Sequence, residues 1–145
     1  MTIISWILSA VLGTISAVHF YWAIGGLWPG TDETSLARTV IGQEKMKAMP
    51  PRWLTALVAL CIAAASIIPL MWSAVISYAV PQGLVWIAMW VLILVFFGRG
   101  IAGYLAFFRK QHSAQPFADL NRKYYSPLCL LIGAGFVMLI YLAGV

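Results

Sequence analysis

Hydrophobic residues follow one another in four long runs, and shorter polar segments separate the runs. A helix needs about 20 mostly apolar residues to cross the hydrocarbon core of a bilayer, and each run is close to that length or longer. The pattern therefore predicts an all-α integral membrane protein, a four-helix bundle that forms a single transmembrane domain over residues 1–145. The predicted spans cover about residues 3–28, 53–78, 84–108 and 127–145.

The composition excludes an ordinary soluble domain. The chain has 145 residues, of which 63% are hydrophobic and 9% are charged, whereas soluble domains average about half apolar and about a quarter charged residues. The first run has no basic segment before it and is too long for the hydrophobic region of a signal peptide. We therefore interpret it as a true membrane span.

The distribution of charge predicts the orientation in the membrane. A net charge of +5 could indicate nucleic-acid binding, but the basic residues are concentrated in two long loops, residues 29–52 and 109–126. Loops rich in Lys and Arg stay in the cytoplasm. We therefore expect both long loops in the cytoplasm and both termini on the extracytoplasmic side. The partner expected is the lipid bilayer and not nucleic acid. The loop charges either contact anionic lipid of the cytoplasmic leaflet or serve only to set the topology.

Small and polar side chains recur on one face of the first span. Small residues let membrane helices approach closely, and serines can hydrogen-bond across the contact. This face is either a packing surface for another helix or the wall of a polar cavity that ends at His19. Its members are Ser5, Ser9, Leu12, Ser16, His19, Ala23 and Gly26.

The first long loop is either a short helix that lies on the headgroups or a plain solvated loop. Asp32 can cap the N-terminus of such a helix, the helix would run through Val40 or Ile41, and Gly42 would end it. Leu36 and Val40 would share its apolar side.

Arg99 is the one Lys, Arg, Asp or Glu residue inside a hydrophobic run. A guanidinium stays charged in a protein and is costly in hydrocarbon, so an arginine in a span is a functional-site hypothesis. One alternative is that the third span is overlong and Arg99 reaches the headgroups. The other is a polar pocket, in which Arg99 pairs with Asp119, with backbone carbonyls and water, or with an anionic ligand that its planar fork can hold in a bidentate way.

Counting residues from the ends of the spans places three polar side chains at a similar depth. His19, Cys61 and Arg99 each lie roughly 12–15 Å inside the cytoplasmic boundary. The candidate ligand-binding residues are Arg99, His19, Trp22, Tyr104, Asp119 and Tyr125. No metal site is expected, because the histidines and cysteines lack the spacing of metal ligands, and nothing in the sequence specifies a cofactor.

Several short motifs resemble those of a known family. They are His19-x-x-Trp22-Ala23-x-Gly25-Gly26, Met49-Pro50, Val58-Ala59, Arg99-Gly100-x-x-Gly103-Tyr104, and Phe117 through Tyr125-Ser126-Pro127-Leu128-Cys129. Together they resemble a bacterial family of small four-span membrane proteins of unknown function. The resemblance implies a four-helix architecture and a multi-pass location in a bacterial inner membrane, and it implies no activity.

Three functions remain open at this point. The first is binding or transport of a small anionic or amphiphilic molecule in a cytoplasm-facing pocket around Arg99 and His19, by a homo-oligomer. The second is a role as an accessory or assembly subunit of a larger membrane complex. The third is an enzyme acting on a lipid-soluble substrate, with His19 as acid or base and Arg99 holding an anion. The third is the least favoured, so the chain is more readily interpreted as a non-enzyme.

The predicted orientation can be tested with reporters fused to the C-terminus. Alkaline phosphatase fused there should be active and green fluorescent protein should be dark, because the C-terminus is expected outside the cytoplasm. The same reporters fused within residues 43–47 should give the opposite pair of signals. A C-terminal reporter that is active only in the cytoplasm would overturn the orientation.

Overall fold

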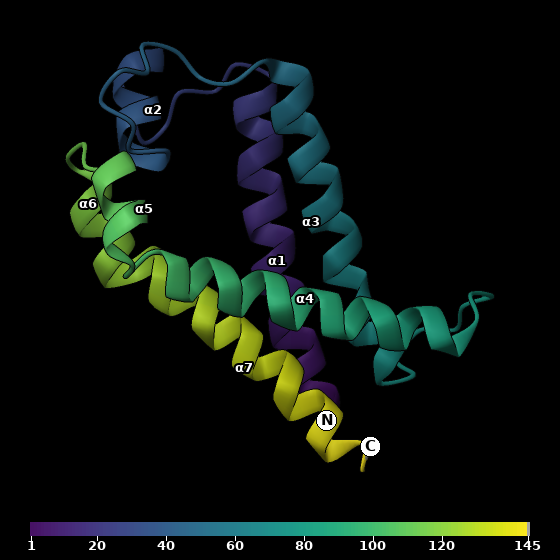
Figure 1. Ribbon diagram of the computed structural model, residues 1–145. Helices are drawn as coiled ribbons and strands as arrows, with labels where there is room; N and C mark the ends of the chain where they lie inside the picture. The colour runs from purple at the N-terminus through teal and green to yellow at the C-terminus, as the bar shows by residue number, and fades with distance from the viewer. Residues whose placement is uncertain (145) are drawn as a thin grey trace.

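The computed structural model describes residues 1–144, and these residues form helices, turns and loops without a strand. Four segments are long and apolar enough to cross a membrane. They contain α1 (Thr2–Ala23), α3 (Arg52–Trp72), α4 (Gln82–Ala102) and α7 (Ser126–Leu142), all visible in Figure 1. The prediction of an all-α protein with four membrane helices is confirmed.

The four long helices form two antiparallel pairs. Helix α1 packs along α3, and α4 packs along α7. The pairs meet in one half of the molecule, where α1 begins and α7 ends, and diverge toward the half that carries the short helices (Figure 1). The hydrophobic core lies where the pairs meet, and its fully buried side chains include Leu12, Met89, Phe136 and Leu139.

The small face of the first span is a packing surface for α3. Ser5 and Ser16 are buried. The Ser16 hydroxyl donates a hydrogen bond of 2.8 Å to the carbonyl oxygen of Ala59, and Ser5 hydrogen-bonds to Ser73. Because Ala59 has no exposed surface, the two helices are in direct contact. Of the two interpretations of this face, the structure supports packing.

Three spans end earlier than the sequence pattern predicts, and the second of them, α3, ends at Trp72 and not near residue 78. The first ends at Ala23, and it is followed by Gly25, whose φ of +98° does not continue a right-handed helix. The third ends at Ala102, and a turn separates it from α5 (Ala106–Gln111). Arg99 therefore lies in the last turn of α4 and not in the middle of a continuous span.

The short helix predicted in the first long loop is present as α2 (Glu33–Val40). The Asp32 side chain accepts a hydrogen bond of 2.7 Å from the backbone N–H of Ser35, and the Ser35 hydroxyl accepts one from the backbone N–H of Asp32. This reciprocal cap satisfies N–H groups that the first turn of a helix cannot. Gly42 has a φ of +79° and follows the helix, as expected.

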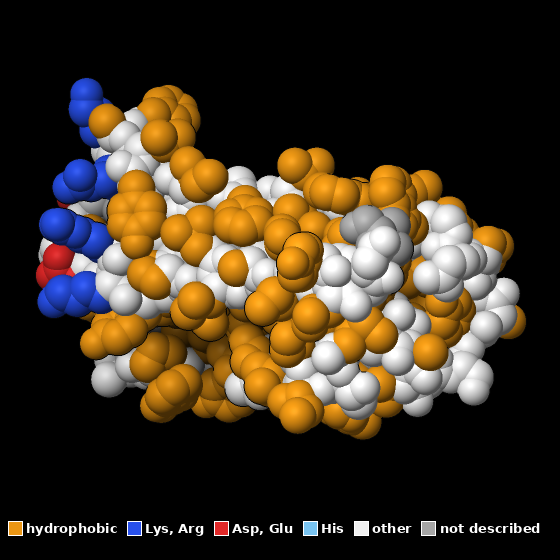
Figure 2. All heavy atoms as spheres, turned by 90° about the horizontal axis from the view of Figure 1, so that it is seen from below, with side chains coloured by type: hydrophobic (Ala, Val, Ile, Leu, Met, Phe, Trp, Pro, Cys, Tyr) orange, Lys and Arg blue, Asp and Glu red, His pale blue; other side chains and the backbone are white. Residues whose placement is uncertain are grey.

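The two long loops meet at one end of the molecule. The second of them contains α5, α6 (Phe117–Leu120) and a turn of π-helix, η1 (Asn121–Tyr125), which leads directly into α7. The backbone N–H of Ala114 donates to the carbonyl oxygen of Gly42 at 3.0 Å, and the buried Phe117 ring lies against Gly42. Figure 2 shows Lys and Arg side chains gathered at one end of a surface that is largely hydrophobic elsewhere.

Gly103 is expected to be essential to the contact between α4 and the start of α7. A Cβ atom at Gly103 would overlap the Ser126 hydroxyl, whereas a Cβ atom at Gly98 on the same helix meets no neighbouring atom within 4 Å. Gly103→Ala should therefore cost about 1–3 kcal/mol of stability, the usual cost of overpacking, and lower the thermal midpoint in detergent. Gly98→Ala is the control and should not lower it. Equal midpoints for the two variants would contradict the close packing at Gly103.

Candidate functional site

The Arg99 guanidinium is held by an amide and an aromatic ring. Its Nη2 donates a hydrogen bond of 2.8 Å to Oδ1 of Asn121. Its Cζ lies 5.0 Å from the centroid of the Phe108 ring, within the range of a cation–π interaction. Its Nη1 is buried and has no hydrogen-bond partner among the described residues. A buried Nη1 does not fit the alternative in which Arg99 simply reaches the headgroups.

Asn121 is the centre of this arrangement. It is the first residue of η1, and only 3% of its surface is exposed. Its Oδ1 accepts hydrogen bonds from Arg99 and, at 3.3 Å, from the Ser126 hydroxyl, while its Nδ2 donates to the carbonyl oxygen of Gly103 at 3.2 Å. The amide therefore connects the end of α4 to the start of α7 and fixes the position of Arg99.

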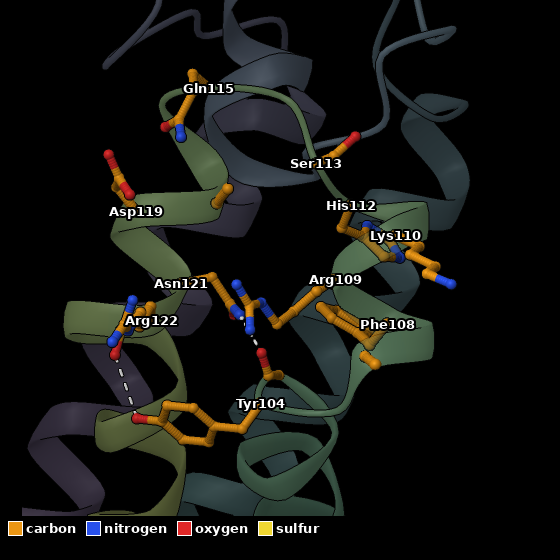
Figure 3. Close-up of a pocket in the computed structure, with 13 residues that line it drawn as sticks. Tyr104, Phe108, Arg109, Lys110, His112, Ser113, Gln115, Asp119, Asn121 and Arg122 are labelled. Carbon is orange, nitrogen blue, oxygen red and sulfur yellow. Dashed lines mark hydrogen bonds between the residues drawn. The ribbon is translucent and has the colours of Figure 1, made fainter.

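A cavity of about 680 Å³ opens beside this network, between α5 on one side and α6 with η1 on the other (Figure 3). Asn121 and Phe108 both line the cavity and both contact Arg99, so Arg99 lies directly behind the cavity wall. In Figure 3 the Arg109 side chain extends from α5 toward Asn121, whereas the Asp119 side chain is directed away from Arg109.

The charges around the cavity are mostly positive. Arg109, Lys110 and Arg122 line it, and Asp119 is the carboxylate among its lining residues. Arg99 adds a further positive charge behind the wall. Clefts lined by one sign of charge concentrate the electrostatic potential and attract ions of the other sign. The cavity is therefore suited to an anion.

An aromatic series connects the cavity to the first long loop. The His112 ring stacks on Phe108, with centroids 4.2 Å apart and planes inclined by 16°, and lies 5.8 Å from Phe117. His112 Nδ1 is 2.6 Å from the carbonyl oxygen of Ile41, so this nitrogen is the protonated donor. The wall of the cavity is thus joined to the residues that follow α2.

The structure brings together some of the predicted site residues. Arg99, Tyr104 and Asp119 all lie at or behind the cavity, and the Tyr104 hydroxyl donates to the carbonyl oxygen of Arg122 at 3.2 Å. Arg99 forms its hydrogen bond with Asn121 and not with Asp119. Tyr125 is half-buried, and its hydroxyl donates to the carbonyl oxygen of Thr39 at 3.4 Å; it joins the two loops and does not line the cavity.

The remaining predicted residues form a separate group on α1. His19 Nδ1 hydrogen-bonds to the carbonyl oxygen of Ile15 at 2.8 Å, and its ring centroid lies 5.0 Å from that of Trp22. Trp22 in turn donates to the carbonyl oxygen of Trp28 at 2.7 Å. Cys61 is exposed on α3. The contacts described for His19 and for Arg99 involve different residues, and a common layer of His19, Cys61 and Arg99 stays a prediction.

Sequence reasoning did not select Asn121, Phe108 or Arg109 as site residues. One available signal was that Asn121 is the single asparagine of the chain, which makes it distinctive among the polar residues of the second long loop. The relation of Phe108 and Arg109 to the site depends on the turn after Ala102, which reverses the course of the chain. No hydrophobic pattern specifies that turn.

Comparison with known proteins gives a family and no activity. Residues 12–136 match the family model described as "Protein of unknown function (DUF3995)". No curated protein and no solved structure matches the chain significantly.

Replacing the Asn121 amide should weaken the fold around Arg99. Asn121→Leu removes the acceptor of Arg99 and the donor to Gly103, and each buried polar group left without a partner costs roughly 1–3 kcal/mol. The thermal midpoint of the purified protein in detergent should fall by several degrees. Gln111→Leu, which replaces a side-chain amide by leucine at an exposed residue of α5, should leave it unchanged. If the two variants have the same thermal midpoint, Asn121 is not the structural centre described above.

Proposed function

The chain belongs to the DUF3995 family of proteins of unknown function, and we propose that it binds a small anionic amphiphile in the cavity beside Arg99. The observation that carries this proposal is the excess of positive charge at the cavity, which Arg109, Lys110 and Arg122 line and behind whose wall Arg99 lies. A charge removed from water costs several kcal/mol unless a counter-charge and hydrogen bonds compensate it. An oxyanion in the cavity would supply a counter-charge to Arg99 across the wall, and it would accept hydrogen bonds from the cationic side chains that line the cavity.

The other groups of the site favour an anion over a further cation. Arg109 extends into the cavity, and the nearby carboxylate, Asp119, is directed away from Arg109 (Figure 3). The Asn121 amide keeps Arg99 in place without neutralising it, since an amide carries no charge. An internal carboxylate at position 121 would have formed an ion pair with Arg99 and removed its attraction for a ligand. The asparagine therefore suits a binding site better than a purely structural one.

The surroundings of the cavity favour a ligand with an apolar part. Ile101, Leu105 and Phe107 expose 52%, 54% and 72% of their surface next to the residues that line it. These side chains lie where a membrane helix gives way to a basic loop, which is where the headgroup and the first part of an acyl chain would lie. A molecule with an anionic head and an apolar tail would match both surfaces.

Binding is better supported than transport by a single copy. The hydrophobic core lies in the half of the molecule opposite the loops, and the residues that line the cavity all belong to residues 103–122 at the loop end. The positive-inside rule places that end in the cytoplasm, and the membrane concerned would be the bacterial inner membrane. His19 is not required in this proposal, because its described contacts lie on α1.

The isosteric change Asn121→Asp tests the proposal. It places a carboxylate against Arg99, so the guanidinium is neutralised within the protein and attracts an external anion less. It also removes the donor to Gly103, so the thermal midpoint of the variant is measured alongside to show that it is folded. Native mass spectrometry in mild detergent would follow binding from an equimolar mixture of dioctanoyl phosphatidate, phosphatidylglycerol and phosphatidylcholine. The wild-type protein should retain the two anionic lipids over the zwitterionic one. Asn121→Asp should reduce that retention about tenfold, a difference of about 1.4 kcal/mol.

Lys123→Gln is the matched control. Lys123 is an exposed cation of the same loop that does not line the cavity, so its loss should leave the retention of anionic lipid nearly unchanged. Equal binding of phosphatidylcholine and the anionic lipids by the wild-type protein would overturn the proposal. So would an Asn121→Asp variant that binds anionic lipid as tightly as the wild type.

A further inference from the structure

We infer that His112 makes anion binding at the cavity depend on pH, because its ring takes up a proton when the anion binds. This inference rests on the proposed function and adds the regulation of that site. It follows from the fixed tautomer of the His112 ring, from an unpartnered ring nitrogen at the cavity, and from the charges around it. Binding should therefore strengthen as the pH falls from about 8 to about 5.5.

The contact with the first long loop fixes which ring nitrogen carries the proton. His112 Nδ1 lies 2.6 Å from the carbonyl oxygen of Ile41, and a carbonyl oxygen only accepts hydrogen bonds. Nδ1 therefore holds the proton of the neutral ring. A neutral imidazole has one donor nitrogen and one acceptor nitrogen, so Nε2 of His112 is the acceptor and is the atom that a second proton would enter.

The Nε2 atom of His112 has no partner within the protein and is open to solvent. The hydrogen bond described for this ring is formed by Nδ1. Among the side chains of residues 1–144 that are not exposed, the buried nitrogen or oxygen without a partner is Nη1 of Arg99. Nε2 of the half-buried His112 is therefore accessible. Since His112 lines the cavity, an anion bound there can reach this nitrogen.

Aromatic side chains hold the His112 ring in place. It stacks on Phe108, with centroids 4.2 Å apart, and its centroid lies 5.8 Å from that of Phe117. Protonation at Nε2 leaves the N–H of Nδ1 unchanged, so the hydrogen bond to Ile41 persists in both states. A cation beside an aromatic face is attracted by the ring. The charge of His112 can therefore change without separating the two loops.

The charged groups around His112 are mostly cations. A further positive charge among cations is unfavourable, and an opposite charge close by favours the protonated ring. An anion in the cavity supplies that opposite charge, so anion binding and proton uptake strengthen each other. The ionisable groups on the surrounding elements are Arg109 and Lys110 on α5, Asp119 on α6, Arg122 on η1, Tyr104 after α4, Arg99 against the Phe108 ring, Glu44, which accepts a hydrogen bond from Ser113 at 3.0 Å, and Arg38 of α2, which lines a second cavity.

The two histidines of the chain, His19 and His112, have different surroundings. Histidine is the side chain whose ordinary pKa lies between pH 5 and 8. The described contacts of His19 lie on α1, with Ile15 and Trp22, and His19 does not line the cavity. A change of anion binding within this pH range is therefore assigned to His112, and His19 provides a matched control.

The test measures the affinity for one anionic lipid at two pH values. Full-length protein in detergent would be titrated with dioctanoyl phosphatidylglycerol at a pH of about 8 and of about 5.5, with dioctanoyl phosphatidylcholine as the zwitterionic reference. A phosphodiester keeps one negative charge over this range, whereas a phosphate monoester itself titrates near pH 6. The affinity of the wild-type protein for phosphatidylglycerol should rise about five- to tenfold at the lower pH, the effect of one added charge at contact distance.

Two variants and one measurement on the wild type assign the effect. His112→Asn removes the titrating ring and keeps a side-chain N–H that can donate to Ile41, so its affinity should be equal at the two pH values. His19→Asn should keep the rise, and thermal midpoints close to that of the wild type would show that both variants are folded. Calorimetry of the wild-type protein in two amine buffers of different ionisation enthalpy should show proton uptake with the lipid at a pH of about 6.5.

The outcomes separate this inference from the proposed function. A preference for phosphatidylglycerol over phosphatidylcholine that is equal at both pH values, without proton uptake, would overturn the role of His112 and leave an anion-binding protein. A rise in affinity that persists in His112→Asn would also contradict this role. If the wild-type protein shows no preference for phosphatidylglycerol at either pH, both the inference and the proposed function are wrong.

Discussion

The hydrogen bond between Arg99 and the buried Asn121 amide is the interaction on which the loop end of the molecule depends. The same amide oxygen accepts from Ser126, and the amide nitrogen donates to Gly103. Through one side chain, the end of α4, the π-helical turn and the start of α7 are therefore held together. The amide also lets the guanidinium keep its charge, which a carboxylate in the same place would cancel.

The network around Asn121 lies apart from the hydrophobic core. The two helix pairs are fixed in the opposite half, where the hydrophobic core lies. Toward the loops the pairs diverge (Figure 1), and the contacts there are mostly between loops: His112 with Ile41, Ala114 with Gly42, and Tyr125 with Thr39. Helix packing thus maintains the fold, while polar contacts between residues distant in sequence shape the cavity.

Much of the fold could be predicted because its signals are local. The four hydrophobic runs specify four membrane helices, and Asp32, Ser35 and Gly42 specify α2 through its capping groups. The anomaly of Arg99 was also visible in the sequence. Its partner was not, because Asn121 lies 22 residues further along the chain and reaches Arg99 only after the turn that ends α4.

The predicted association of His19 with Arg99 depends on counting residues along the spans. Counting gives the depth of a residue along the membrane normal. It does not give the side of the bundle on which its side chain lies. Helix α1 pairs with α3, and α4 pairs with α7, so two residues at one depth belong to different pairs. The small face of α1, in contrast, did indicate a packing surface. Contact between two helices depends on which residues share one face of a helix, and the sequence shows that directly.

The π-helical turn η1 decides in which direction the side chains before and after it point. Asn121 and Ser126 are five residues apart, and in an α-helix, with about 100° of rotation per residue, they would point to different sides. The wider turn aligns them, so that both face the end of α4. Deleting one residue from η1 would turn α6 by about 100° relative to α7. The fold would keep its four spans, but the amide and the guanidinium would no longer meet.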